Sequence, residues 1–494
     1  MKAPSSSVEG LLAITDDETG IAPLLANKLK AHGIQAEVVR SVPNHASGVV
    51  FLGGLRSLTT ESEALAVNYE AFAAAKSVAQ QLTDRGGLFV TVQNTCGSFG
   101  LRGMELQQAW TSGLTGLAKT AALEWPKATV KAIDLEMAGL TKEQAADTIM
   151  AELLLGGPEV EVGLRVNEQR VTVHPEPASL SKSKSKRVIK QKGVIIVTGG
   201  ARGVTAAALQ ALAETASLRF VLLGRTALTE EPEMFKHANT EAELRQILFD
   251  LYQSDGKNIT PRELSTRVQA ILANREIKET LHTLKQLGSH ASYYAVDIQD
   301  QQALAHTLSE VRREWGQITG IIHGAGVLAD KKIADKTPES FDLVFRTKVQ
   351  GLRNLLAVTQ QDPLDLLVLF SSIAARLGNI GQCDYAMANE ILNKIAVVQA
   401  SQRGADCIVK SFNWGAWDGG MVTPSLRTHF TNRGVNLIPI EQGARAFVDE
   451  LLFGDREQIE VVITGDRVGQ GIWGDRYELS ANRYELSQSA YSNA

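Results

Sequence analysis

Ser372, Tyr385 and Asn389 are polar side chains whose spacing suits acid–base chemistry on a carbonyl group. Ser372 follows the apolar run Leu366–Phe370, and Tyr385 comes thirteen positions later. A tyrosine hydroxyl can donate a proton to a carbonyl oxygen within hydrogen-bond reach, and a serine hydroxyl can orient that oxygen and share its developing charge. Asn389 lies four residues after Tyr385, so both share one face of a helix. The pattern predicts a site that reduces a carbonyl group.

A lysine near Tyr385 would complete such a site, because an ammonium group lowers the pKa of a tyrosine by favouring the phenolate. Lys394 lies nine residues after Tyr385, which on a helix corresponds to about 13 Å and the opposite face. Lys348 belongs to the preceding predicted helix and could reach the tyrosine from there. Geometry therefore disfavours Lys394 and leaves Lys348 as the candidate.

The hydride for such a reduction would come from a dinucleotide, and the middle of the chain has a turn suited to bind one. The apolar run Val194–Val197 is a predicted strand that enters a glycine-rich segment. Glycine permits the tight bend, and free N–H groups at the start of the next helix bind the pyrophosphate. Thr205 stands where a third glycine is usual. The predicted contacts are Thr198, Gly199, Gly200, Arg202, Gly203 and Val204.

The end of the second predicted strand indicates which coenzyme is used. Leu222-Leu223 runs into Gly224 and Arg225. An acidic residue at this point holds the ribose hydroxyl of NAD, whereas an arginine accommodates a 2′-phosphate. We therefore predict NADPH, with Arg202 as a second positive charge. Further predicted contacts, after later strands, are Asp297, Ile298, Gly324, Ala325 and Gly326, whereas His323 is interpreted as structural.

Strand-like and helical runs alternate along the whole chain, which predicts an α/β fold with doubly wound parallel sheets. The Ser- and Lys-rich stretch near residue 180 divides the chain and is interpreted as a solvated tether, with a contact patch for an acidic partner as the alternative. In a loose alignment of the two halves, Trp110 takes the place of Tyr385 and Leu114 that of Asn389. We predict a degenerate, noncatalytic Rossmann-like unit at 1–177, a linker at 178–192, a catalytic unit at 193–475 with a helical insertion at 229–287, and a polar tail at 476–494.

The composition restricts the class of protein. The chain has 494 residues, 44% hydrophobic and 21% charged, with a net charge of −5. These values describe a soluble globular protein of two or three domains and give no sign of nucleic-acid binding. Three separated cysteines lack metal-ligand spacing, and neither a membrane-spanning run nor a signal peptide is evident. We expect a cytoplasmic protein without a metal.

From Gly193 to about Asp475 the chain resembles the ketoreductase domains of modular polyketide and fatty acid synthases, within the short-chain dehydrogenase/reductase superfamily. The separation of Lys348, Ser372 and Tyr385 matches that family, in which the lysine and asparagine exchange places relative to the rest of the superfamily. The run Asn413–Met421 resembles the lid-proximal segment of the family, and Gly113–Glu124 resembles its noncatalytic structural subdomain. The insertion and the turn look most like the ketoreductases of polyunsaturated fatty acid synthases.

This resemblance implies NADPH-dependent reduction of a 3-ketoacyl thioester carried on the phosphopantetheine arm of an acyl carrier protein, next to other synthase domains. Asp330 matches the aspartate of B-type enzymes, and Leu377 stands where A-type enzymes carry a tryptophan, which implies a (3R), or D, hydroxy product. Gln382 and Met421 complete the expected substrate groove. The alternatives are a freestanding short-chain alcohol dehydrogenase and an inactive scaffolding domain.

Overall fold

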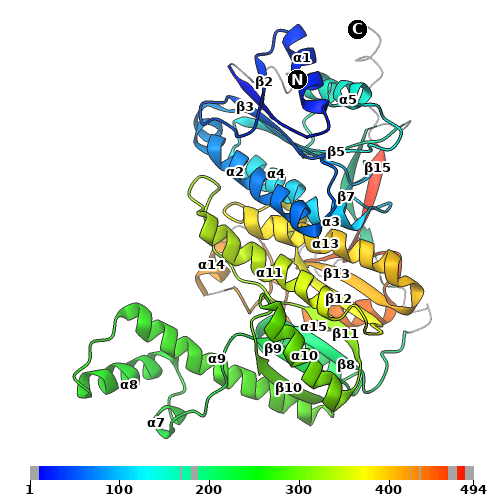
Figure 1. Cartoon of the computed structure of the whole chain (residues 1–494). Helices are drawn as coiled ribbons and strands as arrows, with labels where there is room; N and C mark the ends of the chain where they lie inside the picture. The colour runs from blue at the N-terminus through cyan, green and yellow to red at the C-terminus, as the bar shows by residue number, and fades with distance from the viewer. Residues whose placement is uncertain are drawn as a thin grey trace.

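The computed structural model describes residues 10–166, 170–178, 180, 187–422, 424–432, 435–465 and 476–483. Two α/β halves lie one above the other (Figure 1). In the first, the parallel strand order is β2-β1-β3-β4-β5-β6. Its strands are β1 (Leu12–Thr15), β2 (Ala36–Val39), β3 (Gly48–Gly54), β4 (Gly87–Gln93), β5 (Ala128–Leu135) and β6 (Glu161–Leu164). Its helices are α1 (Ile21–Ala31), α2 (Glu61–Arg85), α3 (Leu106–Thr111), α4 (Gly113–Glu124) and α5 (Lys142–Leu155).

The second half has the parallel order β10-β9-β8-β11-β12-β13-β14. Its strands are β8 (Val194–Thr198), β9 (Arg219–Gly224), β10 (His290–Ala295), β11 (Ile318–His323), β12 (Leu366–Ser372), β13 (Ile408–Trp414) and β14 (Glu460–Ile463). Its helices are α6 (Gly203–Ala213), α10 (Gln301–Trp315), α11 (Pro338–Val358), α12 (Ile373–Leu377), α13 (Cys383–Arg403), α14 (Pro424–Asn432) and α15 (Ile440–Phe453), with a short 3₁₀ turn at Gly404–Asp406.

The two halves share one strand order, since β2-β1-β3-β4-β5-β6 corresponds to β9-β8-β11-β12-β13-β14. In the part of the first half that the structure describes, no strand corresponds to β10, so this half is the truncated copy, as predicted. The central strands β3, β4 and β8 are buried along their whole length. This burial explains why their sequences are mostly continuous apolar runs. In the second half the order reverses between β8 and β11, and a crevice forms at the carboxyl ends of the strands at such a point.

Two antiparallel strands join the halves into one continuous sheet. β7 (Val171–Ala178) pairs with β6, and β15 (Arg476–Arg483) pairs with both β7 and β14. Residues 476–483, assigned from sequence to a polar tail, thus form a strand that covers two sheet edges, because backbone pairing needs no apolar side chains. Residues 179 and 181–186 of the predicted linker, and 484–494 of the predicted tail, lie outside the described residues.

Helices α2 and α4 of the first half pack on α11 and α13 of the second (Figure 1). A Cβ added to Gly116 in α4 would lie 2.7 Å from the backbone of Ala386 in α13, so glycine lets these two helices approach closely. Between α2 and α11, Phe72 and Phe341 stack with ring centroids 4.4 Å apart. The first half therefore supports α13, the helix that carries Tyr385.

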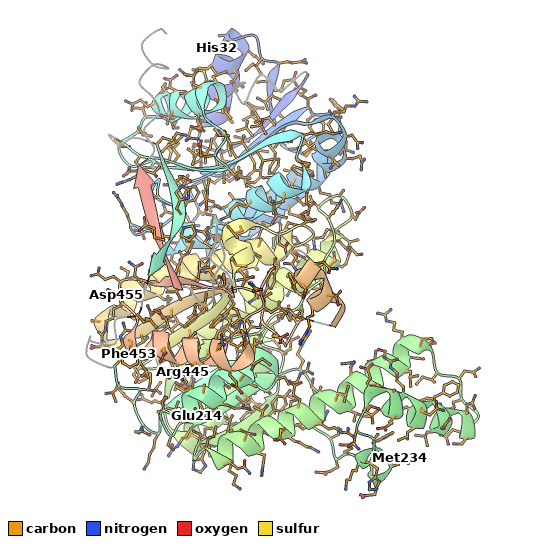
Figure 2. The ribbon with its side chains drawn as sticks, turned by 180° about the vertical axis from the view of Figure 1, so that it is seen from behind. His32, Glu214, Met234, Arg445, Phe453 and Asp455 are labelled. Atoms are coloured by element: carbon orange, nitrogen blue, oxygen red, sulfur yellow. The ribbon has the colours of Figure 1, made fainter. Side chains whose placement is uncertain are left out.

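The predicted insertion forms an arm of three helices that projects from the body (Figure 1). They are α7 (Glu233–Lys236), α8 (Glu241–Ser254) and the long α9 (Pro261–Gln286). Capping boxes at Thr240/Glu243 and Thr260/Glu263 begin α8 and α9. Met234 lies on the arm, away from Glu214 on the body (Figure 2). Among the described residues, none of the helices combines the length and apolar character needed to cross a bilayer.

Candidate active site

A cleft of about 910 Å³ opens at the carboxyl ends of the strands of the second half. It contains most of the residues predicted from sequence, from both the cofactor set and the catalytic set. Eighteen predicted residues line it: Thr198, Gly199, Arg202, Gly203, Val204, Gly224, Arg225, Asp297, Ile298, Gly324, Ala325, Gly326, Lys348, Ser372, Leu377, Gln382, Tyr385 and Met421. The topology thus brings together residues as far apart in the sequence as Thr198 and Met421.

Three predicted residues do not line the cleft. Gly200 faces the core instead, since a Cβ there would meet Val197 at 2.3 Å. Asn389 lies one turn deeper in α13 and is fully buried. Asp330 is exposed beside the cleft, where its carboxylate accepts a hydrogen bond of 2.9 Å from the side chain of Gln382.

The glycine turn has a geometry typical of dinucleotide-binding turns. Gly199 adopts a φ of 66°, and a Cβ there would lie 2.9 Å from the carbonyl oxygen of Gly324. Both the backbone conformation and the lack of space therefore favour glycine at this position. Thr205, which replaces the third glycine, is buried. A Cβ on Gly324 would lie 2.6 Å from its hydroxyl, so the absence of a side chain at Gly324 makes room for the threonine.

His323 holds this turn in place. One ring nitrogen lies 2.8 Å from the hydroxyl of Thr198, and the other lies 3.0 Å from the carbonyl oxygen of Lys348. The ring is fully buried, and burial together with the charge of Lys348 lowers the pKa of His323 to about 3. The ring is therefore neutral and connects β8, β11 and α11, in agreement with a structural role.

Ser372 and Tyr385 line the same cleft. Ser372 ends β12 and begins α12, where its hydroxyl accepts a hydrogen bond of 3.2 Å from the N–H of Ala374. Both side chains line the cleft, and the interaction of Ser372 with Tyr385 acts to lower the pKa of Tyr385. The side-chain N–H of Asn389 donates a hydrogen bond of 2.8 Å to the backbone carbonyl of Tyr385. The buried Oδ1 of Asn389 has no hydrogen-bond partner among the described residues. That oxygen is suited to accept from a water or an ammonium group.

Lys348 reaches the same place from α11. Its Nζ lies 5.5 Å from the centroid of the Tyr385 ring and donates a hydrogen bond of 2.8 Å to the backbone carbonyl of Phe370. A Cβ on Gly326 would lie 3.1 Å from its Cε, so the glycine leaves room for the lysine. Lys394 instead points away, as predicted, and forms buried ion pairs with Glu390 and Glu460.

The sequence-based expectation that the pKa of Tyr385 is lowered is wrong. Burial raises the pKa of Tyr385, while hydrogen bonds from Asn389 and Ser372 act in the opposite direction. Burial also lowers the pKa of Lys348 to about 7, which weakens the ammonium that was expected to favour the phenolate. The raised pKa keeps Tyr385 protonated at neutral pH, which suits a proton donor.

A buried network of six charges lies behind the catalytic helices and was not predicted. Arg376 in α12 contacts Glu390 of α13 at 2.8 Å and Glu161 of β6 at 3.0 Å. Lys119 of α4 pairs with Glu161, and Lys394 pairs with Glu390 and Glu460. Three cations and three carboxylates therefore balance across the boundary between the halves, and all six are at most 9% exposed.

No sequence pattern indicated that the arm lines the cleft. Glu276 and Ile277 of α9, with Tyr293 of β10, form one wall near Arg225. The one available signal was position, because the insertion returns to the sheet immediately before β10 and must therefore pass the carboxyl end of β9.

Comparisons with known proteins agree with this geometry. Residues 193–419 match the family model described as the KR domain. This part of the chain belongs to the KR domain family. The chain is 36% identical over 349 residues to one subunit of the polyunsaturated fatty acid synthase of Thraustochytrium sp., covering 69% of this chain and 12% of that protein. It is 27% identical over 377 residues to polyketide synthase PksN of Bacillus subtilis, covering 71% and 6%.

The fold of this KR-containing chain is similar to a solved ketoreductase domain from the bacillaene assembly line. The TM-score is 0.65 at 21% identity, over 92% of each chain. The similarity therefore extends over both halves and confirms the predicted architecture, in which the KR domain is preceded by a second α/β unit. Since the chain spans 12% or less of these curated synthases, it corresponds to one part of such a protein.

Proposed function

We propose that this chain reduces the 3-keto group of an acyl thioester with NADPH, and that residues 1–177 form a noncatalytic support for residues 193–475. The observation that carries the proposal is the convergence of Lys348, Ser372 and Tyr385 in one cleft with the glycine turn. Membership of the KR domain family supports the same reaction.

The residues present fit a dinucleotide. Gly199, Gly203 and Gly326 leave its path free of side chains, and the N-terminus of α6 faces the cleft. When bound, NADPH supplies the hydride for the ketone carbon. Ser372 then holds the ketone oxygen, and Tyr385 donates its proton to that oxygen. Lys348 stabilises the resulting phenolate, and Asn389 holds the lysine or a relay water through its free Oδ1.

Arg225 supports NADPH over NADH. It is exposed at the end of β9 and lines the cleft, and no carboxylate of the described residues pairs with it. We expect Arg225→Ser to weaken NADPH binding by about tenfold to a hundredfold, because a charge-assisted phosphate contact is lost, and to leave NADH binding unchanged. Titration of nicotinamide fluorescence measures both. Equal weakening for the two coenzymes would contradict a role at the 2′-phosphate, and Arg313→Ser is the matched surface control.

The pH dependence should report Lys348. Below about pH 7 the lysine is an ammonium group that stabilises the phenolate of Tyr385. As pH rises through this value, the lysine becomes neutral and kcat for reduction should fall. Tyr385 does not account for the fall, since burial raises its pKa above the ordinary value near 10. A Lys348→Met variant should have a lower kcat that does not change between pH 7 and 9. If kcat of that variant still decreased as the pH rises, the decrease would have to come from a group other than Lys348.

The substrate groove supports a (3R) product. Asp330 and Gln382 are hydrogen-bonded at its rim, and Leu377 and Met421 are half-exposed within it. Leu377 is smaller than a tryptophan, so it leaves open an entrance to the groove that a tryptophan would fill. The names of the relatives, all multidomain synthases, support a substrate delivered on an acyl carrier protein by neighbouring domains.

A coenzyme-consumption assay with product analysis tests the proposal. NADPH absorbance is followed with a 3-ketoacyl thioester mimic and, in parallel, with a free ketone, and the hydroxy product is resolved on a chiral column. The proposal predicts consumption that depends on the thioester and a (3R) product. Reduction of free ketones alone would favour a freestanding dehydrogenase, and NADPH binding without turnover would favour a scaffolding domain.

A further inference from the structure

The long helix α9 of the arm lies against the coenzyme cleft and is attached there at two points. Thr280 donates 2.9 Å to the carbonyl of Ala201 in the glycine turn. The side chain of Asn274 accepts a hydrogen bond of 2.8 Å from the N–H of Thr229 and donates one of 3.2 Å to the carbonyl of Ala227. Both of these residues belong to the segment after β9. The C-terminal part of α9 therefore has a fixed position relative to the glycine turn and to the segment after β9. The anchors do not involve the side chain of Glu276, since Thr280 contacts only the backbone carbonyl of that residue, at 3.0 Å.

Between these anchors the carboxylate of Glu276 lies at the N-terminus of α6. Its Oε1 accepts a hydrogen bond of 2.7 Å from the N–H of Gly203, the first residue of α6. Its Oε2 lies 3.3 Å from Nε of Arg202. The N–H groups at a helix N-terminus and a neighbouring guanidinium are the donors that a dinucleotide phosphate requires, so Glu276 uses donors that the coenzyme needs.

The carboxylate is held loosely enough to be exchanged. The side chains of Arg202 and Glu276 are 47% and 48% exposed, and both residues line the cleft. An ion pair with this exposure contributes little free energy because water screens it. The 2′-phosphate, and the pyrophosphate as a whole, each carry more negative charge than one carboxylate, so either can replace it. The Glu276 side chain can then turn into solvent without release of Thr280 or Asn274.

On the basis of the proposed function, we propose that Glu276 is a specificity-determining residue that competes with a coenzyme phosphate for Gly203 and Arg202. The inserted arm thereby sets the affinity of the reductase for its coenzyme. The carboxylate must leave before the phosphate can bind, and its negative charge remains near the bound phosphate afterwards. Both effects weaken binding, so removal of the charge should strengthen it.

The test measures coenzyme binding by the whole chain, independently of turnover. Dissociation constants for NADPH and NADH are obtained by nicotinamide fluorescence for the wild type, Glu276→Gln and Glu276→Ala. We expect NADPH to bind about fivefold more tightly to Glu276→Gln, and at least as tightly to Glu276→Ala, which also frees the N–H of Gly203. Glu279→Gln, at an exposed position of the same helix, should bind NADPH as the wild type does.

The two coenzymes identify the phosphate concerned. Tighter binding of NADPH alone places the competition at the 2′-phosphate, and equal tightening for NADH places it at the pyrophosphate. Unchanged or weaker NADPH binding in both Glu276 variants would overturn the inference and leave the proposed function standing. Absence of coenzyme binding by the wild type and every variant would instead contradict the proposed function.

Discussion

Replacement of Tyr385 by phenylalanine is expected to lower kcat for ketone reduction by about 10²–10⁴. The hydroxyl is the proton donor of the proposed reaction; Tyr385 shares the cleft with Ser372, and Nζ of Lys348 lies 5.5 Å from the centroid of its ring. Phenylalanine keeps the ring that packs in the cleft and removes the donor, so the variant should fold and bind NADPH as the wild type does. Single-turnover oxidation of NADPH with a 3-ketoacyl thioester measures the change directly.

The nearby Ser371 provides a matched control for this test. It lies at the same cleft but is buried, and its hydroxyl donates to the backbone carbonyl of Asn389 and to Oδ1 of Asn413. Ser371→Ala should therefore affect kcat far less than Tyr385→Phe does. A Tyr385→Phe variant that retains wild-type turnover would show that another group protonates the ketone.

Replacement of Arg376 by alanine is expected to destabilise the chain by about 3–5 kcal/mol, the usual cost of removing one partner from a buried ion pair. Burial by itself would lower the pKa of Arg376, but Glu390, Glu161 and Glu460 raise it above its ordinary value. Without the guanidinium, three buried carboxylates face two cations. Because Glu161 belongs to the first half and Glu390 to α13, the loss should also loosen the attachment of the catalytic helix.

Urea unfolding followed by tryptophan fluorescence measures this loss, with coenzyme affinity as a second readout. Arg313→Ala is the matched control, since Arg313 pairs with Glu310 at the surface with its side chain 78% exposed, where an ion pair is worth about 0–1 kcal/mol. Equal midpoints for the Arg376 and Arg313 variants would mean that the network does not hold the halves together.

The grouping of the candidate site residues in one cleft could be predicted because the proposed chemistry restricts both residue type and spacing. Helix geometry excluded Lys394, and the structure places that side chain in an ion-pair network away from Tyr385. Apolar runs such as Val194–Val197 marked the central strands, since strands buried on both faces have little other choice of composition. The similarity of the first half to the second could be predicted for the same reason, with Trp110 and Leu114 aligned to Tyr385 and Asn389.

The rest depended on contacts that leave no local pattern. Glu276 and Gly203 are 73 positions apart, and neither residue indicates the other. The Arg376–Glu161 pair spans 215 positions. β15 consists of polar residues whose partner strands, and not their own composition, make them extended. The direction of the Tyr385 pKa shift required the burial of both Tyr385 and Lys348, which spacing alone does not determine.

The central claim is that this cleft transfers hydride to a 3-ketoacyl thioester while Tyr385 supplies the proton. The most direct test uses NADPH that carries deuterium at the transferable position, with mass spectrometry of the product released from its carrier. We predict one deuterium on carbon 3 of the hydroxyacyl product with the wild type, and about a hundredfold less labelled product, or still less, with Tyr385→Phe in the same reaction time. A hydroxyacyl product without deuterium, or equal labelling by the two proteins, would contradict the account.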